Sequence, residues 1–126
     1  MRNQLLSLFQ RYPEVKLAYF FGSRVRGEEG PLSDYDIALY INESDSTKLN
    51  HLYVTIIPEI TRCLNTDDVD VVLLNTVQQP ELAYTIITTG ELLYEQEPFR
   101  ILIEPRILNT YFDFYTLLKQ HHLTNV

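Results

Sequence analysis

The sequence predicts an α+β (α/β sandwich) fold in which helices flank a small mixed β-sheet of three to four strands. Two stretches rich in β-forming residues, 15–21 and 34–41, come early in the chain. Segments with helical spacing of apolar residues alternate with strand-like stretches, a pattern typical of a sandwich built around one sheet. The 126 residues are 45% hydrophobic and 21% charged. We therefore expect residues 1–126 to form a single globular domain.

The first half of the chain is expected to hold two helices and two strands. Apolar residues between positions 5 and 9 predict a short opening helix that Pro13 terminates. Residues 15–21 predict a strand that runs directly into Gly22, and residues 24–33 a turn-rich connection. Residues 34–41 alternate between two faces and predict the second strand. A helix over residues 46–64 follows, with a kink or break expected near position 57 because of Pro58.

The second half predicts two further strands and two further helices. Residues 68–74 predict a third strand, and residues 80–89 a short helix that Gly90 stops. Residues 92–94 are expected to form a short edge strand. A long helix is expected from about residue 99 to residue 121, with a start that Pro105 delays or bends.

Charge and composition exclude several classes of protein. Seventeen acidic and ten basic residues give a net charge of -7. Because nonspecific affinity for nucleic acid comes from Lys and Arg, this balance speaks against direct, stable nucleic-acid binding. No apolar run approaches the roughly 18 residues that span a bilayer, and the N-terminus lacks a signal-peptide pattern. With a single cysteine and therefore no intramolecular disulfide, we expect a cytoplasmic protein without membrane contact.

Aspartates on two predicted strands suggest a metal site. Asp34 and Asp36 fall on one face of the second strand because side chains alternate with a period of two. If the third strand lies beside the second, Asp70 joins them; Asp68 has the same parity and could share that role. Like charges this close favour a bound cation, and oxygen ligands of this kind suit Mg²⁺. Three such carboxylates are what a two-metal phosphoryl or nucleotidyl transfer needs.

The turn after the first strand suggests a phosphate site. Gly22 allows a sharp turn and close approach of a ligand. The Ser23 hydroxyl and the following backbone N–H groups can then hold phosphate oxygens, with Arg24 and Arg26 adding positive charge nearby. Gly-Ser, ten residues, then Asp-x-Asp should arise by chance in roughly one chain in a thousand of this length. The combination therefore predicts a nucleotide and metal site.

These motifs resemble a known family. Gly22-Ser23, the pair Asp34 and Asp36, and a later strand aspartate are similar to the DNA polymerase beta-type nucleotidyltransferase superfamily. The compact chain resembles its minimal nucleotidyltransferase (MNT) branch. The fuller stretches Phe21 to Gly27 and Ser33 to Ala38 are similar to MNT antitoxins of HEPN/MNT toxin–antitoxin modules.

The resemblance implies a polymerase beta-type fold and an activity. Gly22 and Ser23 would bind the triphosphate of ATP. Asp34 and Asp36 would bind two Mg²⁺ ions, and Asp70 would help bind one and activate the attacking hydroxyl. The implied reaction is transfer of AMP to a tyrosine hydroxyl of a cognate HEPN ribonuclease toxin, which neutralises the toxin.

Alternatives stay open at the level of sequence. The acceptor could be a hydroxyl of a small molecule or of RNA, or the protein could be an antitoxin that only binds. Nucleotide preference, the number of AMP units transferred and the stoichiometry of a complex are not determined.

The last predicted helix carries more apolar residues than one stripe needs. A surplus rich in Tyr and Phe either packs within the chain or forms a partner surface. The resemblance favours a partner, and hence a hetero-oligomer with a HEPN toxin. The residues concerned are Ile107, Leu108, Tyr111, Phe112, Phe114, Tyr115, Leu117 and Leu118.

Overall fold

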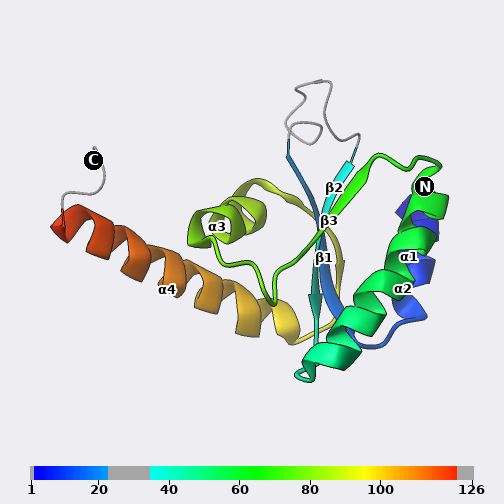
Figure 1. Ribbon diagram of the computed structural model, residues 1–126, viewed down its shortest axis with the longest axis horizontal. Helices are drawn as coiled ribbons and strands as arrows, with labels where there is room; N and C mark the ends of the chain where they lie inside the picture. The colour runs from blue at the N-terminus through cyan, green and yellow to red at the C-terminus, as the bar shows by residue number, and fades with distance from the viewer. Residues whose placement is uncertain (1, 23–34, 122–126) are drawn as a thin grey trace.

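The computed structural model describes residues 2–22 and 35–121, and within them the chain alternates helices and strands (Figure 1). The predicted strands and helices are present, and most of their bounds lie within a residue or two of those expected. In chain order the elements are α1 (Arg2–Gln10), β1 (Val15–Phe21), β2 (Tyr35–Ile41), α2 (Ser46–Leu64), β3 (Val69–Leu73), α3 (Pro80–Thr89), β4 (Glu91–Glu95) and α4 (Phe99–Gln120).

The four strands form one mixed sheet in the order β3-β2-β1-β4. The β1–β2 and β1–β4 pairs are antiparallel, whereas β2 and β3 are parallel. Parallel neighbours need a crossover connection, and α2 provides it between β2 and β3. The small mixed sheet flanked by helices is confirmed, with β4 at one edge and β3 at the other.

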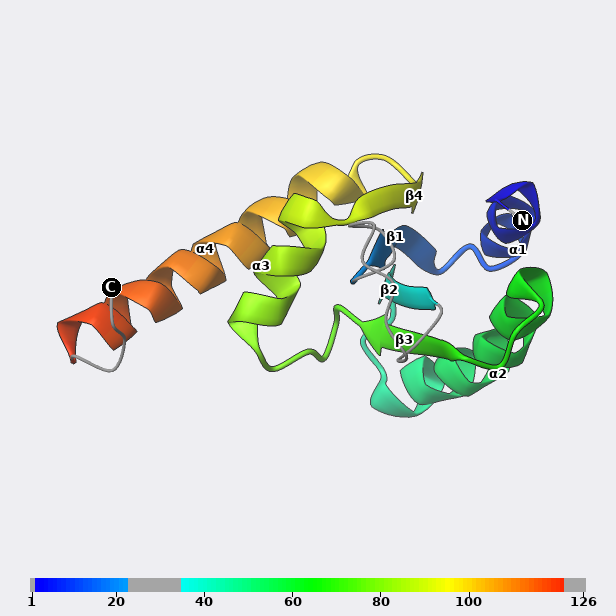
Figure 2. The ribbon, with the colours of Figure 1, turned by 90° about the horizontal axis from the view of Figure 1, so that it is seen from above.

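The sheet stands between two helical layers, with α1 and α2 on one face and α3 and α4 on the other (Figures 1 and 2). Alternation along β2 divides its side chains between them. Ile37 and Leu39 are fully buried in a core shared with α1 and α2, while Ala38 joins a second core with α3 and the start of α4. Asp36 is two residues before Ala38 on the same strand, so its side chain points to the same face of the sheet, the one covered by α3 and α4.

Two helices run through prolines that were expected to disrupt them. α2 is continuous across Pro58, so the predicted break is wrong, and α4 begins at Phe99 without the delay expected from Pro105. Both prolines are exposed. Because proline has no N–H, the carbonyl four residues before it makes no helical hydrogen bond. That carbonyl lies on the solvent side of the helix, where water can hydrate it.

Gly90 ends α3 in extended rather than left-handed backbone, with φ of -74°. Its need for glycine comes from crowding: a Cβ there would lie 2.3 Å from the Ile86 carbonyl oxygen and 2.8 Å from that of Phe20. Backbone atoms cannot yield as a flexible side chain can, so the close approach of α3 to β1 requires a residue without a Cβ.

Gly90→Ala is therefore expected to lower the free energy of unfolding by about 1–3 kcal/mol, the usual range for forced overpacking. Chemical denaturation would measure the loss. Thr88→Ala, an exposed change on the same helix, should stay within about 0.5 kcal/mol of the parent. Equal stability of the two variants would show that the chain relaxes around an added methyl group.

α4 extends well beyond the sheet (Figure 1), and only Ile103 in it is buried. Its base is held by the buried Tyr19 of β1, whose hydroxyl donates to Glu104 at 2.5 Å. Further along, Tyr111 stacks on Tyr84 of α3 with ring centroids 4.0 Å apart. None of the helices among the described residues is long and apolar enough to cross a membrane.

Candidate active site

The parallel pairing of β2 and β3 brings two predicted site residues together. Asp36 and Asp70 are direct register partners, so their side chains leave the same face of adjacent strands, which are about 4.8 Å apart. Sequence alone could not place them side by side, because 33 intervening residues include the whole of α2. Asp36 is half-buried and Asp70 exposed, so the pair opens to solvent on one side.

Gly22 lies directly against Asp36. β1 ends at Phe21, which is the antiparallel partner of Asp36. Gly22 follows with φ of +89°, a conformation that L side chains rarely adopt, and a Cβ there would lie 2.3 Å from Asp36 Oδ2. The glycine thus lets the backbone turn against the carboxylate, whereas sequence reasoning had assigned the close approach to a ligand.

The electrostatics of the pair favour a cation. Burial raises the pKa of Asp36 above its usual value, and the negative charges of Asp70 and Asp68 raise it further. Both effects disfavour the ionised carboxyl as long as no positive charge is nearby. The two carboxylates repel each other, and a bound cation would offset this repulsion. Carboxylate oxygens suit a hard divalent cation such as Mg²⁺.

Four of the predicted site residues, Ser23, Arg24, Arg26 and Asp34, lie outside the described residues. Within 2–22 and 35–121, no three His, Cys, Asp or Glu side chains cluster as metal ligands would. A three-carboxylate site would therefore need at least one carboxylate from outside the described residues, and the sequence motif predicts Asp34 for that place.

Asp68 and Asp70 occupy different places. Asp70 is within β3, whereas Asp68 comes just before the strand, and its carbonyl accepts a hydrogen bond from the Tyr35 N–H at 3.3 Å. Asp68 nevertheless acts on Asp36 through its charge. The direct pairing with Asp36 makes Asp70 the better placed of the two.

A cavity of about 440 Å³ adjoins the carboxylate pair. Asp36, Asp70 and Phe21 line one end of it. Tyr53 and Ile57 of α2 and Leu82 of α3 form its walls, and β3 contributes residues 69–72. Sequence reasoning missed Tyr53 and Leu82. In the sequence both resemble ordinary helix residues that pack on a sheet, and no local signal sets them apart.

Asp36→Asn should stabilise the protein at neutral pH in the absence of metal. Because the pKa of Asp36 is raised in the folded state, the charged carboxylate opposes folding at neutral pH and stops doing so once it is protonated. The gain in Tm should therefore shrink as the pH falls through the range in which Asp36 takes up its proton. Differential scanning calorimetry between pH 7 and pH 4 in EDTA measures it. A gain that does not change with pH would contradict this origin.

Known proteins are similar to this chain in sequence and in fold. The family model described as "Polymerase beta, Nucleotidyltransferase" matches residues 3–99. Protein adenylyltransferase MntA of Aphanizomenon flos-aquae is 31% identical over 103 residues, which cover 76% of this chain and 67% of the relative.

Solved structures share the fold at lower identity. A toxin–antitoxin MntA-HpeT crystal structure superposes with a TM-score of 0.76 at 21% identity, covering 95% of this chain and 94% of that one. A toxin–antitoxin structure with AMP-PNP gives 0.74 at 22%, covering 94% and 93%. A structure of the tri-AMPylated Shewanella oneidensis HEPN toxin in complex with MNT antitoxin gives 0.70 at 21%, covering 94% and 90%.

At these identities the structural matches establish only the fold. The family model and the MntA relative establish the family to which the chain belongs. The chain belongs to the polymerase beta nucleotidyltransferase family and is a homologue of protein adenylyltransferase MntA.

Proposed function

We propose that this protein is an antitoxin that transfers AMP from ATP to a tyrosine hydroxyl of a HEPN toxin and thereby neutralises it. The single observation that carries the catalytic part is the register pairing of Asp36 with Asp70 beside the left-handed Gly22. The named activity of the MntA relative supports adenylyl transfer. The complexes with AMP-PNP and with an AMPylated HEPN toxin support the nucleotide and the acceptor.

Each site residue has a distinct proposed role. Asp34, Asp36 and Asp70 would hold two Mg²⁺ ions. When bound, these ions would offset the negative charge of the triphosphate and lower the pKa of the acceptor hydroxyl. Gly22 would let the backbone approach the triphosphate while keeping Asp36 in place. Ser23 would donate to phosphate oxygens, with Arg24 and Arg26 adding positive charge.

The reaction would be a displacement at the α-phosphorus of ATP. The tyrosine oxygen forms a bond to phosphorus, the bond from phosphorus to the pyrophosphate oxygen breaks, and pyrophosphate leaves. Asp70 accepts the phenolic proton, which makes it the general base. Tyrosine has an ordinary pKa of about 10, so proton removal at neutral pH needs help of only a few pH units.

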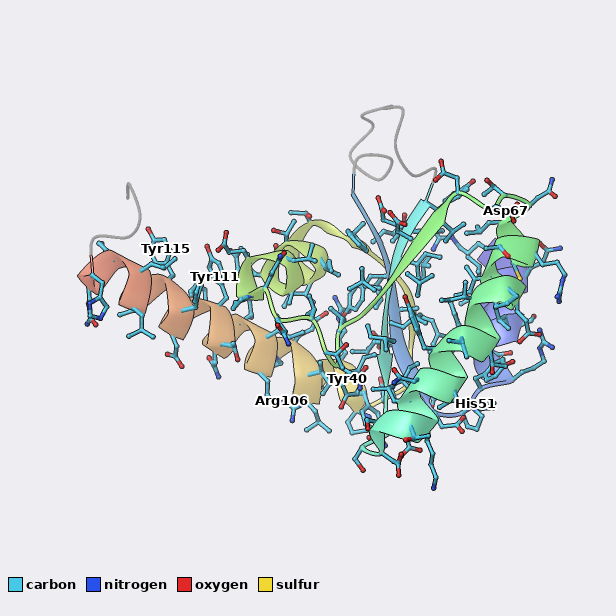
Figure 3. The ribbon with its side chains drawn as sticks, in the orientation of Figure 1. Tyr40, His51, Asp67, Arg106, Tyr111 and Tyr115 are labelled. Carbon is cyan, nitrogen blue, oxygen red and sulfur yellow. The ribbon has the colours of Figure 1, made fainter. Side chains whose placement is uncertain are left out.

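α4 is the proposed partner surface. Ile101 is 75% exposed, and Leu102, Phe112 and Leu117 are each more than half exposed. Tyr111 and Tyr115 project from the same side of α4, with Tyr111 against α3, where it stacks on Tyr84, and Tyr115 further along the helix (Figure 3). Exposed apolar and aromatic residues on a projecting helix are typical of a protein interface. A hetero-oligomer with the toxin follows, and a cytoplasmic location stays a prediction.

The test is transfer of label from ATP to a partner protein. The protein is incubated with α-labelled ATP, Mg²⁺ and the product of the adjacent reading frame, and labelled products are separated by size. Label on a tyrosine of that partner supports the proposal. Label only on small molecules or RNA would contradict the acceptor. Neutralisation that survives Asp34→Ala combined with Asp36→Ala would show an antitoxin that acts by binding alone.

Metal binding can be tested without turnover. Mg²⁺ should raise the Tm of the parent protein, because a ligand that binds only the folded state stabilises it. The same concentration should raise the Tm of Asp36→Asn less. An equal rise in both proteins would contradict a site at Asp36.

A further inference from the structure

The strand that carries Asp70 has no further strand beside one of its edges among the described residues. β3 is the last strand of the sheet, and its only neighbouring strand among the described residues is β2. On its other side lies the cavity described above, between the α2 wall at Tyr53 and Ile57 and the α3 wall at Leu82. Edge strands are templates for the addition of a further strand. Here that edge forms one side of the cavity that contains Asp36 and Asp70.

The hydrogen bonds of β3 show which backbone groups face this edge. Asp68 O accepts from Tyr35 N at 3.3 Å, and Leu74 N donates to Leu39 O at 2.8 Å. The backbone N–H and C=O groups of the even-numbered residues along β3 therefore face β2. Alternation then turns the N–H and C=O groups of Val69 and Val71 outward. The Tyr53 hydroxyl, which donates to Val71 O at 2.7 Å from α2, agrees with this assignment.

The outward groups bracket Asp70. In parallel pairing, a residue of the added strand lies opposite one residue of the existing strand. Its N–H donates to the carbonyl of the residue that precedes this opposite residue, and its carbonyl accepts from the N–H of the residue that follows the opposite residue. A residue opposite Asp70 would thus bond Val69 C=O and Val71 N–H. Its side chain would lie on the face of Asp70 and Asp36, one strand spacing of about 4.8 Å from Asp70.

The surroundings specify the chemistry of such a segment. The walls at Ile57 and Leu82 are apolar and half-buried, which suits apolar side chains on either side of the central residue. Asp67 and Asp68 are exposed where the strand begins, and Asp67 projects outward there (Figure 3). Their charge favours a basic residue at that end of the segment.

We propose that the acceptor protein presents its tyrosine on an extended segment that adds to β3 as a parallel strand, with the tyrosine opposite Asp70. This inference rests on the proposed adenylyl transfer and adds how the acceptor is recognised. The main chain of the acceptor supplies the two hydrogen bonds, and its phenol reaches the carboxylate pair. A small hydroxyl compound has no main chain to make these bonds and would be a poor acceptor.

The experiment compares acceptors that differ in their main chain. The probes are N-acetyltyrosinamide and an acetylated, amidated five-residue peptide with a central tyrosine, flanking valines and terminal lysines. Two copies of the peptide carry a single N-methyl group, one on the tyrosine nitrogen and one on the nitrogen of the next residue. In the proposed pairing the tyrosine N–H faces Val69 O, whereas the next N–H points away from β3.

The peptide should have a kcat/KM about tenfold above that of N-acetyltyrosinamide, as two modest hydrogen bonds and apolar contacts provide. Methylation at the tyrosine nitrogen should remove the gain, and methylation at the next nitrogen should leave it. Equal effects of the two methyl groups, or equal rates for peptide and N-acetyltyrosinamide, would overturn the docking mode while leaving adenylyl transfer intact. Transfer to none of the probes and to no partner protein would overturn the proposed function itself.

A variant tests the same contact from the protein side. Val71→Pro removes the outward N–H, and proline is tolerated at an edge strand whose N–H faces away from the sheet. Val71→Ala, which loses a similar amount of packing but keeps the N–H, is its matched control. The ratio of peptide to N-acetyltyrosinamide kcat/KM should fall to about 1 in the proline variant only. Hydrogen exchange at the Val71 amide of the parent protein should also slow when the peptide binds, and unchanged exchange would contradict the pairing.

Discussion

Asp70→Asn should lower the rate of adenylyl transfer by about a thousandfold, within the range for loss of a general base. The carboxylate oxygen that would accept the phenolic proton becomes an amide, while shape and size hardly change. Asp70 is exposed, so the fold should be retained. Quenched-flow transfer of label from ATP at saturating Mg²⁺ measures the rate.

Asp67→Asn is the matched control for this change. It removes the same charge from a neighbouring exposed position, and Asp67 does not line the cavity at the carboxylate pair. With N-acetyltyrosinamide as the acceptor, which carries no basic residue to meet Asp67, the change should cost less than about threefold, because exposed charges act weakly through water. An equal loss in the two variants would mean that general negative charge near β3 matters, rather than a base at Asp70.

Combining Asp70→Asn with Asp36→Asn gives a further check. Residues that act as one unit are strongly non-additive, so the double variant should be only slightly slower than the slower single variant. Multiplication of the two losses would indicate that Asp36 and Asp70 act in separate steps.

Gly22→Ala should reduce transfer by about a hundredfold, the loss associated with misplacing a catalytic group by about 1 Å. The new Cβ would lie 2.3 Å from Asp36 Oδ2, so the carboxylate has to move. The positive φ of +89° adds strain, and we expect a loss of stability of about 1–2 kcal/mol. Steady-state kinetics and urea denaturation measure the two effects.

A double-variant cycle separates the clash from the strain. In an Asp36→Ala background the contacting carboxylate is gone, so Gly22→Ala should then destabilise the protein only through its backbone conformation. The destabilisation in that background should be smaller than in the parent. Strict additivity would show that the contact with Asp36 has no energetic consequence.

Much of the fold could be predicted from local sequence patterns. β1 (Val15–Phe21), α2 (Ser46–Leu64) and α3 (Pro80–Thr89) have the predicted bounds, because runs of β-forming residues, helical spacing and a first-turn proline act within a few residues. Pro58 does not break α2 and Pro105 does not delay the start of α4, and the reason is nonlocal. Whether a helix tolerates a proline depends on which side faces solvent, and that is decided by packing against the sheet.

Sequence patterns could name candidate site residues but not the geometry that the structure gives to Gly22, Asp36 and Asp70. The parity of Asp36 followed from alternation along one strand, and the choice of Asp70 followed from the assumption that the third strand lies beside the second. The crowding of Gly22 by Asp36, and the Tyr53 hydroxyl on Val71, had no signal in the sequence. Each joins residues from different elements, so only their positions in space reveal the contact.

The sequence by itself determined the order of strands and helices, the faces of each strand and the residues proposed to bind phosphate and metal. These follow from side-chain alternation and backbone preferences, which are properties of neighbouring residues. The tertiary structure alone decided that β2 and β3 pair in parallel with Asp36 opposite Asp70, that Gly22 lies against Asp36, and that β3 is the last strand of the sheet on its side among residues 2–22 and 35–121. Strand order and register are set by burial of the two cores on either side of the sheet, a property of the whole chain.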